Sequence, residues 1–246
     1  MSSTNSTKCA CGREIEPFTT PFTQQTIIPL QCEWCRERAE AVRLEREREV
    51  RVQDLLEKSN LPDAAMEWTI DRAAQDARKG FEAARYWQYS PEGLYIYGQP
   101  GTGKTVLAWC LIKREIEDNF RTGLYLKCHS FLEQLRQRKA EGFSLSNLAT
   151  QADVLVLDDL GAERPTDWVR ERILSLIDER IDARKPVIIT SNLSPGDLYF
   201  HLGGDVQTLR ITDRIIGACR VVKFEGVSFR KQAARARKQE QVGMEF

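Results

Sequence analysis

The chain has 246 residues, enough for one sizeable hydrophobic core and a second, small module. Its 36 Lys and Arg residues balance 36 Asp and Glu residues, so a nucleic acid would have to bind at a local patch. No apolar run approaches the roughly 18 residues that a membrane span needs, which excludes a membrane-spanning protein. The polar N-terminus lacks the apolar core of a signal peptide, so we expect a cytoplasmic protein without disulfides.

Four of the seven cysteines lie within the first 35 residues, in two close pairs. Together the pairs could surround one tetrahedral zinc ion with four thiolates. Gly12, directly after the first pair, suits a left-handed turn that points backbone amides at a sulfur. The alternative is four ordinary reduced thiols, but a stretch of about 40 residues is too short to hold a core without a staple. We predict a zinc-binding module at residues 1–36, with the ligands Cys9, Cys11, Cys32 and Cys35.

A highly charged segment follows these cysteines. Residues 36–58 carry seven basic and seven acidic side chains and no Gly or Pro, with opposite charges four residues apart, as at Arg43 and Glu47. Its apolar residues form neither a heptad nor a clean stripe, which favours an exposed connecting helix over a coiled coil. We therefore expect a helical linker at residues 37–60 and a larger domain at residues 61–246.

A glycine-rich segment of the larger domain, Gly-Gln-Pro-Gly-Thr-Gly-Lys-Thr at residues 98–105, matches the pattern G-x4-G-K-[ST]. It follows a strand-like run at residues 93–98 and precedes a segment of helical periodicity at residues 106–120. Backbone amides of such a loop converge on phosphate oxygens, while Lys104 suits the β and γ phosphates and the Thr105 hydroxyl suits Mg²⁺. The alternative is a plain glycine turn between strand and helix, but the fixed positions of the pattern seldom arise by chance in such a chain. The predicted nucleotide contacts are Gly98, Gln99, Pro100, Gly101, Thr102, Gly103, Lys104, Thr105 and Val106.

Two acidic residues end a second strand-like run. Residues 151–159 contain a continuous apolar stretch, typical of a parallel strand buried on both faces, and finish at Asp158 and Asp159. Ligands bind at the carboxyl ends of such strands, so Asp158 suits Mg²⁺ and Asp159 suits orienting and deprotonating an attacking water. A third apolar run, residues 186–192, ends in Asn192, which suits the same water or the γ phosphate. Without the phosphate loop upstream, these residues would be read as ordinary turns.

Strand-like and helical segments alternate through the larger domain. Besides the runs above, we expect strands at residues 123–128 and 219–224 and helices at residues 130–139 and 166–184. This alternation predicts an α/β fold in which a parallel sheet is flanked by helices on both faces.

The order of the motifs is distinctive. The phosphate loop is followed by Val-Leu-Val-Leu-Asp-Asp-Leu-Gly (154–161), Ile-Ile-Thr-Ser-Asn (188–192), Leu-Arg-Ile-Thr-Asp-Arg (209–214) and Gly-Val-Ser-Phe-Arg (226–230). Over about residues 61–232 this order resembles the DnaC/DnaI type of AAA+ ATPase, the replicative-helicase loaders. The four-cysteine module resembles the zinc-bearing N-terminal domain of the DnaI branch. The same motifs also fit the IstB type of transposition helper ATPase, a close relative of the loaders.

This resemblance implies an AAA+ P-loop domain that binds ATP and Mg²⁺, shares nucleotide sites with neighbouring subunits and holds single-stranded DNA inside the assembly. It also implies that a hexameric replicative helicase, bound through the N-terminal module, is loaded onto single-stranded DNA at replication initiation.

Two arginines take their roles from the same resemblance. Arg214 resembles the arginine finger that reaches a neighbour's γ phosphate, and Arg230 resembles the second sensor, which acts within its own subunit. The alternative is that Arg210 and Arg214 belong to an ordinary solvated helix face. Many AAA+ proteins have Glu where this chain has Asp159, so we expect slow hydrolysis that assembly or DNA stimulates.

Candidate DNA contacts follow the second acidic residue. Arg164 and Thr166 lie at an expected helix start that suits phosphate, and Trp168 suits base stacking. Phe143 is a second candidate for stacking, and the alternative for both aromatics is packing in the core. Two other functions remain open: a transposition helper that acts on duplex DNA with a transposase, and a nucleotide-gated adaptor that binds protein without hydrolysing ATP.

Overall fold

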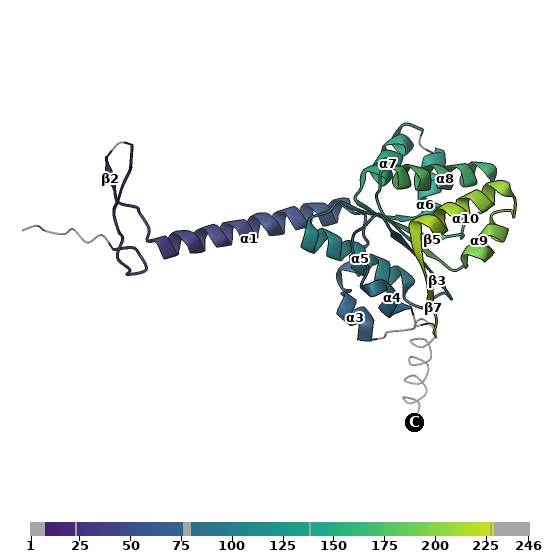
Figure 1. Cartoon of the computed structure of the whole chain (residues 1–246), viewed down its shortest axis with the longest axis horizontal. Coiled ribbons are helices and arrows are strands. Elements are labelled where there is room, and N and C mark those ends of the chain that lie inside the picture. The colour runs from purple at the N-terminus through teal and green to yellow at the C-terminus, as the bar shows by residue number, and fades with distance from the viewer. Residues whose placement is uncertain (1–7, 23, 76–79, 138, 227, 229–246) are drawn as a thin grey trace, which may run out of the picture. The chain divides into compact units, whose positions relative to one another are not determined.

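The structure, a computed structural model, is shown in Figure 1. The chain divides into two units, residues 1–53 and 54–246. No helix within the described part of the chain is long and apolar enough to cross a membrane. The structure describes residues 8–22, 24–75, 80–137, 139–226 and 228.

The first unit contains a small module built around sulfur. A two-stranded antiparallel hairpin pairs β1 (Phe18–Thr19) with β2 (Thr26–Ile27). The module buries only a few apolar groups, and their burial does not offset the conformational entropy that is lost when the chain becomes ordered. Small folds with so little buried apolar surface commonly use a metal for stability. Its buried cluster consists of Cys9, Ile15 and Cys32, with the half-buried Cys35 packed against it.

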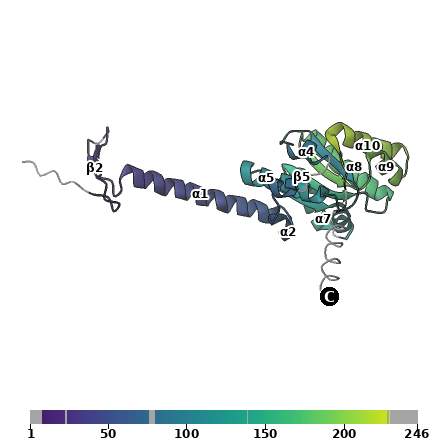
Figure 2. The same ribbon diagram turned by 90° about the horizontal axis from the view of Figure 1, so that it is seen from below.

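Helix α1 (Glu33–Lys58) begins in the first unit and ends in the second, and it is one uninterrupted helix in both views (Figures 1 and 2). None of its residues is fully buried, and opposite charges pair along its surface, as at Arg43 and Glu47 (Nε to Oε1, 3.7 Å). The exposed helix predicted for residues 36–58 is confirmed, and it begins slightly earlier, at Glu33.

The second unit contains a five-stranded, all-parallel sheet in the order β4-β5-β6-β3-β7. The middle strands are short runs of branched and aromatic residues buried on both faces, as the sequence predicted. All carboxyl ends of the strands therefore lie at one edge of the sheet. The strands are β3 (Gly93–Gly98), β4 (Gly123–Lys127), β5 (Val154–Leu160), β6 (Val187–Ser191) and β7 (Cys219–Phe224).

Helices cover both faces of the sheet, which confirms the predicted α/β architecture (Figure 1). Alternate residues of a strand enter two separate cores: Val156 of β5 belongs to one, and its neighbours Leu155 and Leu157 belong to the other. The first core is covered by α3 (Ile70–Gln75), α4 (Phe81–Arg85) and α5 (Lys104–Asn119), and α2 (Asp63–Met66) packs against α5. The second is covered by α6 (Cys128–Gln137), α7 (Lys139–Gln151), α8 (Asp167–Asp182), α9 (Pro195–His201) and α10 (Val206–Ala218).

Two predicted helices begin earlier than their periodicity indicated. α5 begins at Lys104 rather than at residue 106, because the loop glycines turn the chain directly into its first turn. α6 begins at Cys128 rather than at residue 130, immediately after β4. The sequence did not place α7, α9, α10 or the short helices before β3. Brief or mixed segments lack a clear 3.6-residue period, but α10 has one, because its buried residues Thr208, Ile211, Thr212 and Ile215 lie on one face.

The chain that leaves α1 attaches to β4, an edge strand of the sheet. The Tyr125 N–H donates to the Ser59 carbonyl (2.8 Å), and Asn60 Nδ2 donates to the Tyr125 carbonyl (2.9 Å). Asn60 adopts the left-handed conformation (φ 57°) that commonly ends a helix. These bonds satisfy outward-facing main-chain groups of the edge strand, which would otherwise invite pairing with another chain.

Arg180 of α8 holds the amino ends of two central strands, at the end of the sheet opposite the carboxyl ends. Its side chain is fully buried, as a cation can be only when hydrogen-bond partners offset the loss of water. The partners lie where the chain enters the two neighbouring strands β5 and β6. The guanidinium donates to the carbonyls of Ala149, Ala152, Asp153 and Pro186.

Candidate nucleotide site and cysteine cluster

The phosphate loop joins β3 to α5 and is shaped by glycines. Gly101 (φ 82°) and Gly103 (φ 93°) adopt left-handed conformations that side chains disfavour. A Cβ on Gly101 would also lie 2.1 Å from the Ser228 hydroxyl oxygen, so the chain after β7 passes close to the loop. Because α5 begins at Lys104, its free N-terminal amides and the positive end of its dipole face the loop, where an anion binds favourably.

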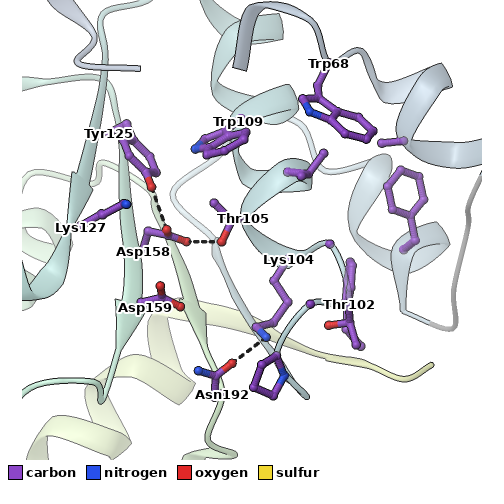
Figure 3. Close-up of a pocket in the computed structure, with 17 residues that line it drawn as sticks. Trp68, Thr102, Lys104, Thr105, Trp109, Tyr125, Lys127, Asp158, Asp159 and Asn192 are labelled. Carbon is purple, nitrogen blue, oxygen red and sulfur yellow. Dashed lines mark hydrogen bonds between the residues drawn. The ribbon is translucent and has the colours of Figure 1, made fainter. Parts of the chain in front are cut away.

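Lys104 is almost fully buried, and its ammonium is held at a fixed point (Figure 3). Its Nζ donates to the carbonyls of Gly98 (2.9 Å) and Gln99 (3.0 Å). It also donates to Oδ1 of Asn192 (2.9 Å), which follows β6 and is 88 residues away in the sequence. The fold therefore brings together two of the predicted site residues, and it fixes a positive charge beside the phosphate loop.

Asp158 lies at the carboxyl end of β5 and is 1% exposed. Three hydroxyl groups donate to its carboxylate. Thr105 (2.8 Å) donates to Oδ1 and Tyr125 (2.7 Å) donates to Oδ2 (Figure 3). Thr190 (2.5 Å) also donates to Oδ1. Burial, and then the charge of Asp158, raise the pKa of Tyr125, so its phenol keeps its proton and remains a donor at neutral pH. The sequence assigned Thr105 and Asp158 each to Mg²⁺ and did not predict the hydrogen bond between them. Thr190 and Tyr125 were not singled out by the sequence.

Asp159 is set apart from Asp158 by a break in the strand pairing. The register of β5 with β6 shifts between Leu157 and Leu160, and Asp159 adopts a left-handed conformation (φ 59°) that is unusual for a residue with a side chain. Its N–H donates to the Thr190 hydroxyl (3.0 Å). The irregularity turns the exposed Asp159 carboxylate toward the cavity, next to the buried Asp158 (Figure 3).

These groups line a cavity of about 380 Å³. Its polar part combines the phosphate loop with Asp158, Asp159 and Asn192. Lys127, the last residue of β4, also lines the cavity and was not singled out from the sequence. It could have been predicted, because ligands bind at the carboxyl ends of parallel strands. The remaining walls are largely apolar and suit a flat heterocyclic base. Apart from Val106, which was predicted together with the phosphate loop, their residues belong to no local motif and come from segments far apart in the sequence. They include Trp68, Ala73, Phe81, Val106, Trp109 and Phe224.

Arg214 does not line this cavity. Its Nε lies 3.3 Å from Oδ1 of Asp178 on α8, and Arg210 approaches the other oxygen of the same carboxylate at 3.9 Å. Both arginines border a separate hollow between α8 and α10. The structure thus keeps Arg214 away from the phosphate loop of its own chain, and Arg230 lies outside the described residues.

The candidate DNA contacts lie around the start of α8. Arg164 is exposed, and the Thr166 side chain caps α8 by accepting from a first-turn N–H. Trp168 is half-buried against the second core, with the Arg136 guanidinium 5.2 Å from its ring centre. Phe143 belongs to α7, but its side chain lies outside the described residues.

The four N-terminal cysteines form a cluster. Their sulfurs all lie within 4.8 Å of one another, and those of Cys11 and Cys32 are 3.5 Å apart. Zinc–sulfur bonds of about 2.3 Å in a tetrahedron put the sulfurs about 3.8 Å apart, so the cluster fits a zinc ion. Gly12 makes the expected left-handed turn (φ 85°). The amides of Cys11 and Cys32 lower the pKa of Cys9 to about 6, whereas the hydrogen bond with Cys11 raises the pKa of Cys35 to about 12. Close sulfurs therefore do not all ionise together in the metal-free cluster.

Comparison with known proteins agrees with this geometry. The family described as IstB-like ATP binding protein matches residues 33–237. The chain belongs to this family of IstB/DnaC-like AAA+ ATPases. Members of the family bind ATP, which accounts for the phosphate loop and the charged end of the cavity.

Relatives of this AAA+ ATPase include a replicative helicase loader and ATP-binding proteins of insertion sequences. The replicative helicase loader DnaI of Bacillus subtilis is 27% identical over 145 residues, which cover 55% of this chain but only 46% of DnaI. The ATP-binding protein named for insertion sequence IS5376 of Geobacillus stearothermophilus is 27% identical over 196 residues, 77% of each chain.

Among solved structures, the DnaC helicase loader superposes with a TM-score of 0.56 at 25% identity, covering 67% of this chain and all of that one. AMPPCP-bound DnaA from Aquifex aeolicus shares the fold at 19% identity, with a TM-score of 0.52 over 71% of this chain and 55% of that one.

We expect freshly reduced protein to contain about one zinc ion per chain and Cys32→Ser to lose it, because a hydroxyl replaces a thiolate poorly as a zinc ligand. Metal analysis by mass spectrometry measures the ratio. Cys110→Ala, which removes a buried thiol of α5, is the matched control and should keep its zinc. Wild-type protein free of zinc would contradict the assignment, and the second unit should fold in either case.

Proposed function

We propose that this chain hydrolyses ATP to ADP and phosphate, and that hydrolysis times the loading of a replicative DNA helicase onto single-stranded DNA at replication initiation. The observation that carries the ATPase part is the meeting of Lys104, Asp158, Asp159 and Asn192 at one end of a cavity whose other walls suit a base.

Each group has a distinct role in this proposal. The loop amides and Lys104 bind the β and γ phosphates, and Thr105 with Asp158 would hold Mg²⁺, which neutralises charge on those phosphates. Asp159 orients a water and takes its proton as the oxygen attacks the γ phosphorus. The bond to the β–γ bridging oxygen breaks, and ADP leaves with that oxygen. Asn192 donates from its amide nitrogen to the γ phosphate or to the water.

Two arginines complete the proposed site. Arg214, remote from the cavity of its own chain, suits a site on a neighbouring copy, where its guanidinium would stabilise the charge that develops on the γ phosphate. Arg230, which lies outside the described residues, takes in this proposal the role that the family resemblance implies, a sensor within the same chain.

Similarity supports the loader role. The DnaC helicase loader is matched over its full chain, and DnaI is a related helicase loader. The cysteine cluster favours the DnaI branch, whose N-terminal domain it resembles. In this role the zinc module binds the hexameric helicase, and copies of the chain assemble through shared ATP sites. Single-stranded DNA contacts the start of α8 through Arg164, Thr166 and Trp168 and, from α7, Phe143.

A second candidate function is a transposition helper that acts on duplex DNA with a transposase. It is favoured by the match to the IS5376 protein, which covers 77% of both chains. Binding to single-stranded and duplex DNA of equal length, compared over a salt series with ATP and Mg²⁺, separates the two functions. We expect at least tenfold tighter binding to the single strand. A preference for the duplex would replace the loader by the helper.

Asp159→Asn should retain ATP binding but reduce hydrolysis at least about a hundredfold, because the amide cannot accept the proton of the attacking water. Lys104→Ala should weaken ATP binding itself. Phosphate release and calorimetric titration measure the two effects, with the exposed Asp118→Asn of α5 as the control. Equal hydrolysis by wild type and Asp159→Asn would remove the assigned role. Wild-type turnover no faster than background would favour a non-hydrolysing adaptor.

Arg214→Ala should leave the ATP affinity of the monomer nearly intact but abolish the rise in activity with protein concentration or single-stranded DNA. Mixing Arg214→Ala with Asp159→Asn tests sharing of the site. The second variant then lends its arginine to a site whose own acid is intact, so activity should return. Arg210→Ala, a change on the same helix, is the control. It should be active without added Asp159→Asn subunits. No recovery in mixed assemblies of confirmed stoichiometry would contradict a shared finger.

A further inference from the structure

Tyr125 belongs to two parts of the second unit at once. Its main chain is bonded on both sides to the segment that leaves α1: its N–H donates to the Ser59 carbonyl, and its carbonyl accepts from Asn60 Nδ2. Its phenol donates to Oδ2 of Asp158, 2.7 Å away in the buried interior. One residue therefore joins the segment that leaves α1 to the Asp158 carboxylate, which also accepts from Thr105.

The segment after α1 is held too firmly for this contact to be incidental. Ser59 is fully buried, and its hydroxyl donates to the Leu56 carbonyl (2.6 Å) and accepts from the Leu61 N–H (3.3 Å). The neighbouring Leu55, on the last turns of α1, packs with Leu56 against the core that α5 covers. A shift of this segment would have to move the main chain of Tyr125.

The phenol is equally constrained at the other end. The Tyr125 side chain is 3% exposed, and the Trp109 indole packs edge-on against its ring, with centroids 6.1 Å apart. Tyr125 also sits opposite Val156 in the β4–β5 pairing, two residues before Asp158 on the neighbouring strand. The hydroxyl consequently reaches only the Oδ2 side, whereas Thr105 and Thr190 occupy Oδ1.

We propose that Tyr125 is a positioning residue that couples the exit of α1 to Asp158, so that Mg²⁺-nucleotide at the phosphate loop and the ordered Ser59–Asn60 segment stabilise each other. This inference rests on the proposed function, in which Asp158 holds Mg²⁺. A carboxylate fixed in one orientation binds the cation more tightly than a freely rotating one, because less orientational freedom is lost. Coupling between two sites is reciprocal, so bound nucleotide must in turn stabilise the ordered Ser59–Asn60 segment after α1.

The test measures binding of a non-hydrolysable ATP analogue with and without Mg²⁺, in the full chain. The readout is the factor by which Mg²⁺ tightens binding. Tyr125→Phe removes only the hydroxyl, and Asn60→Gly removes the amide donor while tolerating the left-handed backbone. Each should lower that factor about three- to tenfold, as expected for one lost hydrogen bond. The double variant should lose no more than the larger single effect, because both changes break the same connection.

Two matched controls separate coupling from general loosening. Tyr199→Phe removes a phenol-to-carbonyl hydrogen bond in α9, which does not line the cavity. Asp54→Ala removes an exposed ion pair with Lys58 on the last turn of α1 without touching Tyr125. Both should keep the wild-type Mg²⁺ factor.

Hydrogen exchange gives the reciprocal measurement. Mg²⁺-nucleotide should slow amide exchange at residues 59–61 several-fold in the wild type and not in Tyr125→Phe. Additive losses in the double variant, or exchange at these residues that Mg²⁺-nucleotide leaves unchanged in the wild type, would overturn the coupling.

Asp158→Asn distinguishes failure of this inference from failure of the proposed function. If that variant keeps the wild-type Mg²⁺ factor, Asp158 does not hold the cation and the proposed magnesium site is wrong. If it abolishes the factor while Tyr125→Phe and Asn60→Gly leave it unchanged, the site stands and only the coupling is overturned.

Discussion

A carboxylate taken out of water must find hydrogen-bond donors, and the site of this protein is organised around that requirement at Asp158. The donors are Thr105 at the start of α5, Tyr125 on β4 and Thr190 on β6. Three elements flanking β5 are thus held in register with its carboxyl end. Thr105 is the last residue of the phosphate-loop motif, so its hydrogen bond to one buried anion also fixes the loop against the sheet.

The neighbouring acid is placed by the opposite means. The hydrogen bonds of Asp158 are made in the interior, whereas Asp159 is turned outward by its own left-handed backbone conformation. That conformation costs roughly 1–2 kcal/mol for a residue other than glycine. The Thr190 hydroxyl offsets part of that cost, because it accepts from the Asp159 N–H while donating to Asp158. Two adjacent carboxylates thereby acquire different surroundings, one dry and bonded and the other accessible to water.

Part of the site is encoded in short local motifs and can be predicted from the sequence. The phosphate loop, the two acids and Asn192 could be predicted because each is a short motif at the end of an apolar run, and parallel strands bring such ends together. The walls around Trp68, Phe81 and Phe224 could not, since their meeting depends on how three distant segments fold. Thr190 and Tyr125 were hidden for another reason: in a buried strand, a polar side chain that serves a carboxylate has the same pattern as one that fills the core.

The grip of Arg180 on the amino edge gives the sheet two unlike ends. At that end the fully buried guanidinium of Arg180 ties the entries of β5 and β6 to the end of α7. At the carboxyl end the same strands finish in hydroxyls, acids and an amide whose bonds a ligand can exchange for its own. A ligand in the cavity therefore meets strand ends whose side chains can change hydrogen-bond partners, while the amino ends of the same strands stay tied to α7 through Arg180.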